Sequence, residues 1–192
     1  PPFGTNLTYP LERYTRFHQT SGTTGTPLRV LATPESWDEW GRCWEAVLRA
    51  AGVTPRDRLF FAFSFAPAIG FWSAFHGATR LGALCIPSGG ASSLRRLRMI
   101  EETGATVLLC TPSYGLHLAE EATREGVAIA ASSIRALVLA GEPGGSVPAL
   151  TTLFTWASGI LTAVMDNVLA VATFIPIIND VATTGIQTFP LW

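Results

Sequence analysis

Short apolar runs alternate with longer segments of mixed polarity along residues 59–140. The apolar runs are residues 59–63, 83–86, 106–110 and 136–140, and the segments between them that look helical are residues 69–81, 92–103 and 112–125. The runs are almost continuously hydrophobic, which is typical of strands in a parallel sheet that helices cover on both faces. The pattern predicts an α/β fold in which runs 59–63, 106–110 and 136–140 lie side by side in one mostly parallel sheet flanked by helices.

The ends of the expected helices carry residues that commonly begin and end helices. Thr33 is a suitable N-cap, Pro34 suits the first helical position, and Gly52 follows residues 37–51 as a stop signal. The charged residues of segment 92–103 are Arg95, Arg96, Arg98, Glu101 and Glu102. They favour a solvent-exposed helix face over a phosphate site, so we expect no ligand there.

The composition of the chain changes near residue 149. All 13 basic residues are arginines, and the last of them is Arg135. After Glu142 the only ionisable side chains are Asp166 and Asp180. The change predicts two parts, residues 1–149 and an apolar tail of residues 150–192 that is foreign to the first part.

Two apolar stretches of the tail, residues 150–165 and 168–178, flank the polar pair Asp166 and Asn167. Together they exceed the roughly 20 residues needed to cross a bilayer, but each alone is too short. A membrane helix interrupted at the pair and a buried helical hairpin that turns at the pair both fit this pattern. Both interpretations predict an apolar helical tail with little contact to the sheet, and the first predicts membrane association through residues 150–178.

Composition and charge exclude some classes of partner. The chain has 192 residues, 48% of them hydrophobic and 14% charged, and a formal net charge of -1. Because this charge creates no basic field, we expect small-molecule ligands and no nucleic acid. The three cysteines lack the spacing of a zinc site or a disulfide framework, which favours a cytoplasmic setting. The chain begins without methionine, so we expect a piece of a longer protein.

A run of hydroxyl residues and glycines, His18-Gln-Thr-Ser-Gly-Thr-Thr-Gly-Thr-Pro27, differs from any core helix or strand. Its amides and hydroxyls can surround a phosphate, because glycine permits unusual turns and short Ser and Thr side chains donate hydrogen bonds. A solvated turn between two strands is the alternative. The run is no Walker A loop, because no Gly-Lys-Ser/Thr follows and the chain has no lysine. For His18, orientation of the loop or of a substrate and ordinary burial remain open.

The stretch Thr20-Ser-Gly-Thr-Thr-Gly-Thr-Pro27 resembles the phosphate-binding loop of adenylate-forming enzymes. Further stretches resemble the phenylacetate–CoA ligase branch of that superfamily, in the order found there. They are residues 63–72, 80–87, 104–112 and 141–145. The resemblance extends over nearly all of residues 9–149, and it implies that residues 1–149 are a partial AMP-binding, or adenylation, domain from the N-terminal part of such an enzyme.

The resemblance implies two-step chemistry that uses ATP, Mg²⁺ and CoA. A carboxylic acid attacks the α-phosphate of ATP to give an acyl-adenylate and pyrophosphate, and the CoA thiolate then displaces AMP. The residues implied to bind ATP are Thr20, Ser21, Gly22, Thr23, Thr24 and Gly25 around the phosphates, and Gly141, Glu142 and Pro143 against adenine. Those implied to form the aryl or acyl pocket are Phe65, Ile69, Phe71 and Trp72, for which plain core packing is the alternative.

The chain departs from the family pattern after residue 149. The family would continue with a Tyr-Gly-x-Thr-Glu segment whose carboxylate is linked to Mg²⁺, a ribose-binding Asp and a mobile C-terminal domain, and none of these follows. We therefore expect no catalytic or metal-binding residues here, and a ligase fragment that is inactive alone. The tail resembles a broken-helix segment of ion-transporter superfamily antiporters, so a fragment of a membrane ion transporter is an alternative function. A nucleotide-binding module without catalysis is another.

Overall fold

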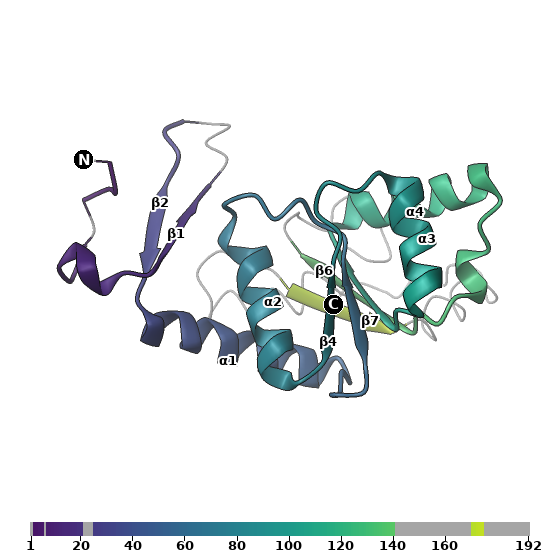
Figure 1. The fold of residues 1–192 in the computed structure, drawn as a ribbon, viewed down its shortest axis with the longest axis horizontal. Helices are drawn as coiled ribbons and strands as arrows, with labels where there is room; N and C mark the ends of the chain where they lie inside the picture. Colours follow the sequence, from purple (N-terminus) through teal and green to yellow (C-terminus); the bar gives the residue numbers. More distant parts are fainter. Residues whose placement is uncertain (1, 6, 21–24, 141–169, 175–192) are drawn as a thin grey trace, which may run out of the picture.

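A five-stranded sheet forms the centre of the computed structural model, which describes residues 2–5, 7–20, 25–140 and 170–174 (Figure 1). Its strands are β3 (Arg58–Phe61), β4 (Leu84–Pro87), β5 (Val107–Cys110), β6 (Ala136–Ala140) and β7 (Ala170–Phe174). They lie in the order β4-β3-β5-β6-β7, and the first four are parallel. The α/β fold predicted from the apolar runs is confirmed, and β3, β5 and β6 lie side by side as predicted.

The helices begin and end close to where the sequence predicts. They are α1 (Pro34–Ala50), α2 (Ile69–Leu81), α3 (Ser93–Thr103) and α4 (Pro112–Glu125), with short 3-10 helices at Leu11–Arg13 and Ile129–Ala131. Thr33, Ser92 and Thr111 cap α1, α3 and α4, each accepting a hydrogen bond from the backbone amide three residues further along. A cap side chain pairs with a backbone amide that would otherwise have no partner at the helix start. Cap residues in the sequence therefore predict where these helices begin.

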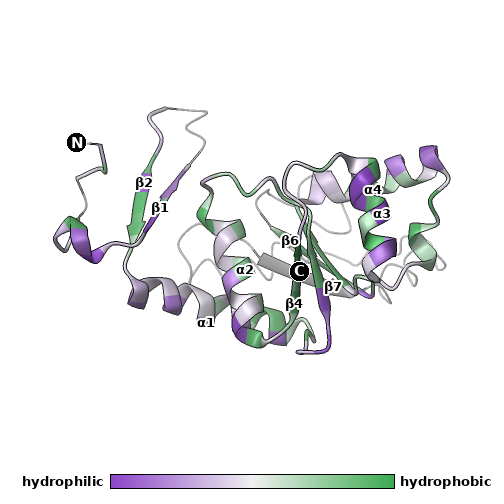
Figure 2. Ribbon diagram, viewed as in Figure 1, coloured by the Kyte–Doolittle hydropathy of each residue, from purple (hydrophilic) through white to green (hydrophobic). Residues whose placement is uncertain are grey.

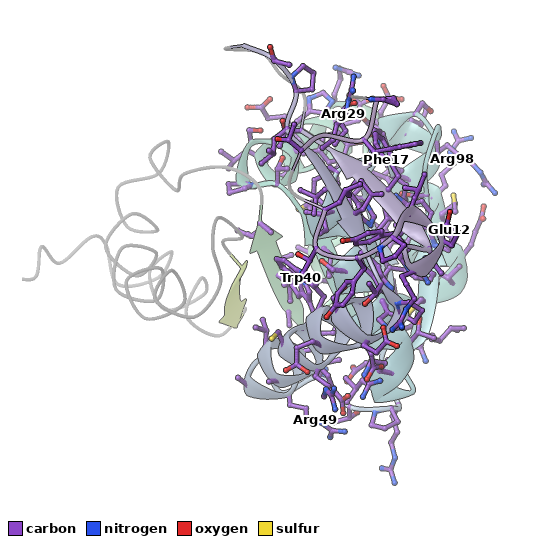
Figure 3. The ribbon with its side chains drawn as sticks, turned by 90° about the vertical axis from the view of Figure 1, so that its left-hand side faces the viewer. Glu12, Phe17, Arg29, Trp40, Arg49 and Arg98 are labelled. Carbon is purple, nitrogen blue, oxygen red and sulfur yellow. The ribbon has the colours of Figure 1, made fainter. Side chains whose placement is uncertain are left out.

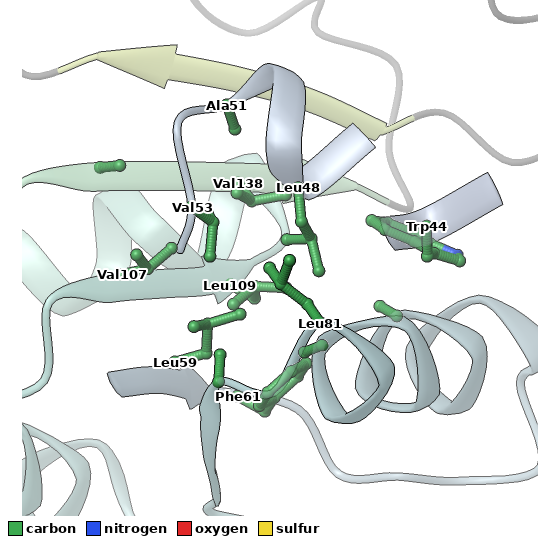
Figure 4. Close-up of a cluster of buried hydrophobic side chains, with 14 of the residues drawn as sticks. Trp44, Leu48, Ala51, Val53, Leu59, Phe61, Leu81, Val107, Leu109 and Val138 are labelled. Carbon is green, nitrogen blue, oxygen red and sulfur yellow. The ribbon is translucent and has the colours of Figure 1, made fainter. Parts of the chain in front are cut away.

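Each face of the sheet buries its own apolar cluster, because side chains alternate along a strand. Leu59 and Phe61 of β3 pack toward α1 and α2, whereas Phe60 packs toward α3 and α4. Figure 4 shows the first cluster, in which Trp44 and Leu48 of α1 approach this side of the sheet. Figure 2 shows mostly hydrophobic residues on central strands such as β6, while the helices carry both kinds. Helices on both faces therefore account for the continuous apolar runs.

Strand β7 corrects the prediction of an apolar helical tail. It lies at the edge of the sheet, antiparallel to β6, with Ala170 opposite Ala140. The prediction of a helix with little contact to the sheet is therefore wrong for residues 170–174. The outer edge of β6 offers backbone groups for pairing, and the stretch Ala-Val-Ala-Thr-Phe contains the β-branched and aromatic residues that favour strands.

The rest of the tail, with the predicted break at Asp166 and Asn167, lies outside the described residues. The division of the chain at residue 149 accordingly stays a prediction. Within the part of the chain that the structure describes, no helix combines the length and apolarity needed to span a bilayer.

Helices α1 and α2 approach closely where glycine faces the neighbouring helix. A Cβ atom on Gly77 would lie 2.4 Å from the Cβ of Trp44 and 3.0 Å from the carbonyl oxygen of Gly41. We expect Gly77→Ala to lower the free energy of unfolding by about 1–3 kcal/mol, because overpacking outweighs the better helix propensity of alanine. Urea unfolding at neutral pH measures this change.

Gly115→Ala in α4 is the matched control for Gly77→Ala. The nearest atom to its new Cβ would be the Cys110 Sγ at 3.3 Å, a milder contact. Its effect on the free energy of unfolding should therefore stay within about 1 kcal/mol. Equal destabilisation by the two substitutions would contradict the close crossing of α1 and α2.

Candidate functional site

The hydroxyl-rich loop lies at the tip of a hairpin formed by β1 (Arg16–Gln19) and β2 (Arg29–Ala32), which are antiparallel. Figure 1 shows the hairpin at one end of the molecule, apart from the five-stranded sheet. The Thr20 amide donates to the Leu28 carbonyl at 3.0 Å, and the Leu28 amide donates to the Thr20 hydroxyl at 2.9 Å. Thr20 thus joins the two ends of the loop through both its backbone and its hydroxyl.

Most of the predicted nucleotide ligands lie outside the described residues. These are Ser21, Gly22, Thr23, Thr24, Gly141, Glu142 and Pro143. Gly25 is described, and no atom of the described residues lies within 4 Å of a Cβ built on it. Residues 141–143 directly follow Ala140 at the carboxyl end of β6. Ligands of open α/β sheets bind at the carboxyl ends of the strands, and the adenine role of residues 141–143 stays a prediction.

A backbone hydrogen bond joins the base of the loop to the predicted acyl pocket. The Gln19 amide, at the end of β1, donates to the Pro67 carbonyl at 2.8 Å. Pro67 lies between β3 and α2, in the segment that contains Phe65 and leads into the first turn of α2, where Ile69, Phe71 and Trp72 lie. The structure thereby brings together two motifs that are far apart in the sequence.

Three of the four predicted pocket residues belong to one aromatic cluster. The ring of Phe71 stacks on Phe63 with centroids 3.9 Å apart, and Phe65 meets Trp72 edge to face at 4.9 Å. Trp72 is 41% exposed, whereas Phe63 is buried, so core packing explains Phe63 better than Trp72. Ile69, the fourth predicted residue, begins α2 and is partly buried. The cluster offers apolar, ring-shaped surface next to the loop.

Phe65 has an unusual backbone conformation. Its φ of 51° lies in the left-handed region, and among the described residues it is the only non-glycine residue with positive φ. This conformation is unfavourable for a bulky side chain and persists only where the surroundings impose it. Such residues concentrate at ligand sites, which fits the pocket role predicted for Phe65.

His18 attaches the hairpin to α1. It is buried, and its ring stacks on Trp37 with centroids 4.9 Å apart. Burial, with a smaller contribution from the charge of Arg16, lowers the pKa of His18 below its ordinary value. A buried imidazole stacked on Trp37 fits ordinary burial as well as orientation of the hairpin, so both interpretations of His18 stay open.

The burial of Arg96 contradicts the prediction that the charged residues of segment 92–103 form an exposed helix face. The side chain is buried, and its guanidinium donates to the carbonyl oxygens of Ser88 and Phe63. The prediction is wrong here because Arg96 shares the inner face of α3 with Leu97 and Ile100, both buried. The helical spacing from Arg96 to Ile100 was a usable signal for this position.

Comparison with known proteins shows to which family the chain belongs. Residues 17–156 match the family described as AMP-binding enzyme. The chain belongs to this family. The match continues past residue 149, where the composition changes, so the compositional change does not coincide with the end of the family segment.

The curated relatives of this AMP-binding chain include phenylacetate-coenzyme A ligases. The chain is 36% identical over 143 residues to that of Escherichia coli (strain K12), and 34% identical over 142 residues to that of Thermus thermophilus. Each match covers 74% of this chain and 32% of the relative, so the chain spans about a third of the relatives' length. The resemblance to the phenylacetate–CoA ligase branch is confirmed.

Solved structures agree with the sequence relatives. An open conformation of 2-hydroxyisobutyryl-CoA ligase in complex with 2-HIB-AMP and CoA has a TM-score of 0.71 and 30% sequence identity, covering 83% of this chain and 37% of that chain. The family match and these relatives give no support to an ion-transporter fragment or to membrane association of the tail.

Proposed function

We propose that this chain supplies the phosphate loop and the acyl pocket of an AMP-forming, ATP-dependent aryl- or acyl-CoA ligase that works in the cytoplasm. The observation that carries the proposal is the 2.8 Å hydrogen bond from Gln19 to Pro67, which ties the loop to the aromatic segment. Activation of a carboxylic acid requires the nucleotide phosphates and the acid to meet, and a bond between the strand leading into the loop and the segment preceding α2 supports such a meeting. Membership of the AMP-binding enzyme family supports the same conclusion.

In the first step, a carboxylate oxygen bonds to the α-phosphorus of ATP, and the bond from that phosphorus to the oxygen of the leaving pyrophosphate breaks. Amides and hydroxyls of residues 21–25 stabilise the charge that develops on the pyrophosphate. Thr20 and Leu28, which flank this run, are joined by two hydrogen bonds. In the second step the CoA thiolate attacks the acyl carbon and AMP leaves.

Mg²⁺ belongs to the proposal as a companion of ATP. In the described part of the chain, no group of three or more His, Cys, Asp or Glu side chains is arranged to hold a metal ion. The donors of the loop are hydroxyls and amides, which suit phosphate oxygens better than a metal. The contribution of Mg²⁺ when bound with ATP is neutralisation of phosphate charge.

The aromatic cluster favours an aryl acid as the substrate class. Phe65, Phe71 and Trp72 present ring faces and edges that pack against another ring. Phenylacetate is a suitable probe, and 2-hydroxyisobutyrate is a small aliphatic probe for comparison. We expect the chain to bind phenylacetate more tightly than 2-hydroxyisobutyrate.

Titration calorimetry of the 192-residue chain with ATP and with each acid tests the proposed function. Trp72→Ala should weaken phenylacetate binding about tenfold, because it removes an exposed ring from the pocket, and should change the ATP dissociation constant by less than about twofold. Trp40→Ala, a partly exposed tryptophan of α1 (Figure 3), is the matched control and should change neither constant.

Binding of ATP without either acid would leave a nucleotide-binding module as the function. Absence of binding for both ATP and the acids would remove the ligase proposal for this chain. Equal effects of the two tryptophan substitutions on phenylacetate binding would place the acid elsewhere.

A further inference from the structure

Arg96 is a buried cation on a helix whose other arginines are exposed. It is 8% exposed, whereas Arg95 and Arg98 lie on the outer side of α3, where Figure 3 labels Arg98. Its contacts among the described residues are carbonyl oxygens and an aromatic ring, with no carboxylate. Burial of a charge is unfavourable unless hydrogen bonds compensate for lost water, so these contacts define what Arg96 does.

The guanidinium of Arg96 bridges the chain where it leaves two adjacent strands. Its Nε and Nη2 donate to the Ser88 carbonyl at 3.3 and 3.2 Å, and Nη2 also donates to the Phe63 carbonyl at 3.4 Å. Ser88 directly follows β4, and Phe63 lies just beyond β3. The guanidinium carbon lies 5.0 Å from the ring centroid of Tyr114 at the start of α4. Arg96 therefore connects three elements at the carboxyl edge of the sheet.

The segment that Arg96 holds is the one that carries the aromatic cluster. The ring of Phe63 stacks on Phe71, and two residues beyond Phe63 the chain adopts the left-handed conformation of Phe65. The ring of Phe65 in turn meets Trp72. A fixed Phe63 carbonyl therefore restrains the turn that places Phe65 against Trp72.

We infer that Arg96 is a positioning residue for the acyl pocket: by holding the carbonyls of Phe63 and Ser88, it keeps Phe65 in its left-handed conformation with its ring against Trp72. The inference deepens the proposed function and rests on it. Arginine suits this role because its planar fork reaches two acceptors at once, whereas the ammonium of lysine is a point charge.

Three variants of the 192-residue chain test the inference. Arg96→Met removes the donors while keeping an apolar stem, Arg96→Lys keeps the charge, and Arg98→Met on the exposed side of α3 is the matched control. Hydrogen exchange without ligand reports on the backbone of residues 62–72. Titration calorimetry with phenylacetate and with ATP reports separately on the pocket and the loop.

In Arg96→Met, amide exchange in residues 62–72 should become at least about tenfold faster, while exchange in β5 and β6 changes by less than about twofold. The phenylacetate dissociation constant should rise about tenfold and that of ATP less than about twofold. Arg96→Lys should be intermediate in both measurements, and it provides the test if Arg96→Met does not fold. Arg98→Met should match the parent.

Two results would overturn the inference. Faster exchange throughout the sheet would show that Arg96 stabilises the whole fold, and unchanged phenylacetate binding in both Arg96 variants would show that the pocket does not depend on it. Failure of the parent chain to bind phenylacetate is a different result, because it contradicts the proposed function. In that case the ligand-free exchange pattern alone decides whether Arg96 positions the segment.

Discussion

Replacement of Thr23 and Thr24 by valine is expected to slow adenylate formation by about ten- to a thousandfold for each lost hydroxyl. Valine keeps roughly the shape of threonine and removes its donor. If both hydroxyls stabilise the departing pyrophosphate, their loss raises the barrier of that step directly. Transfer of the acyl group to CoA does not release pyrophosphate, so this second step should change far less.

A chimera provides the catalytic context for the threonine substitutions, since the chain spans 32% of its Escherichia coli relative. Residues 17–156 replace the matching segment of that phenylacetate-coenzyme A ligase. Pyrophosphate release measures the first step, and thioester formation from supplied acyl-adenylate measures the second. Thr26→Val, an exposed position in the same loop, is the matched control and should affect neither step.

The two half-reactions separate the possible roles of the loop. Equal slowing of both would mean that the threonines maintain structure. No slowing of either would remove the loop from the chemistry and with it the main sequence argument for a ligase. Slowing by Thr26→Val equal to that by Thr23→Val would show that the effect is not specific to the proposed donors.

The sheet was predictable because its signal is local. Strands β3, β5 and β6 are apolar over nearly their whole length, and the helices that precede β5 and β6, α3 and α4, each begin at a recognisable cap. Strand β7 was not predictable in this way. Its five residues lie inside a long apolar stretch, where periodicity cannot distinguish a strand from a buried helix, and its partner β6 lies about thirty residues earlier.

The candidate site was predictable in its parts and unpredictable in its assembly. The loop and the aromatic segment were each recognisable as motifs, but the bond from Gln19 to Pro67 is a long-range contact that depends on how the hairpin docks. The buried position of Arg96 ran against the general rule that arginines are exposed. The guanidinium of Arg96 donates to carbonyl oxygens that lie just beyond β3 and β4. The sequence of α3 does not predict these acceptors.

At the amino ends of the central strands, a hydrogen-bonded network of charged and polar side chains joins three strands. The sequence alone did not predict this network. Asp57, Thr106 and Arg135 are the residues directly before β3, β5 and β6. The Asp57 carboxylate accepts hydrogen bonds from Arg135 Nη2 at 2.6 Å and from the Thr106 hydroxyl at 2.8 Å. It also accepts one from the Thr54 amide at 2.8 Å. One buried carboxylate therefore joins the beginnings of three adjacent strands.

The ionised form of Asp57 contributes to stability. Burial by itself would raise the pKa of Asp57, but hydrogen bonds from Arg135, Thr54 and Thr106 outweigh burial and lower the pKa from 3.8 to about 2. A lowered carboxyl pKa gives stability that is present above the unfolded-state value and lost as the pH falls through the folded-state value. The difference corresponds to about 2 kcal/mol, lost between about pH 4 and pH 2.

Asp57→Asn should lower the free energy of unfolding by about 2–3 kcal/mol at neutral pH. The amide keeps the shape of the carboxylate but leaves Arg135 without its counter-ion; Arg135 is partly exposed, so water recovers some of the loss. Urea unfolding across a pH series measures the effect. Because asparagine does not titrate, the gap between parent and variant should narrow as the pH falls from about 4 to about 2.

The control for Asp57→Asn is Glu102→Gln, which breaks the ion pair of Arg95 and Glu102 at 2.9 Å. Both side chains are 54% exposed, so this substitution should change the free energy of unfolding by less than about 1 kcal/mol. A gap for Asp57→Asn that persists down to about pH 2 would mean that the variant loses stability through hydrogen bonds that asparagine cannot reproduce and not through the charge. A gap that closes means that the charge of Asp57 joins the three strands.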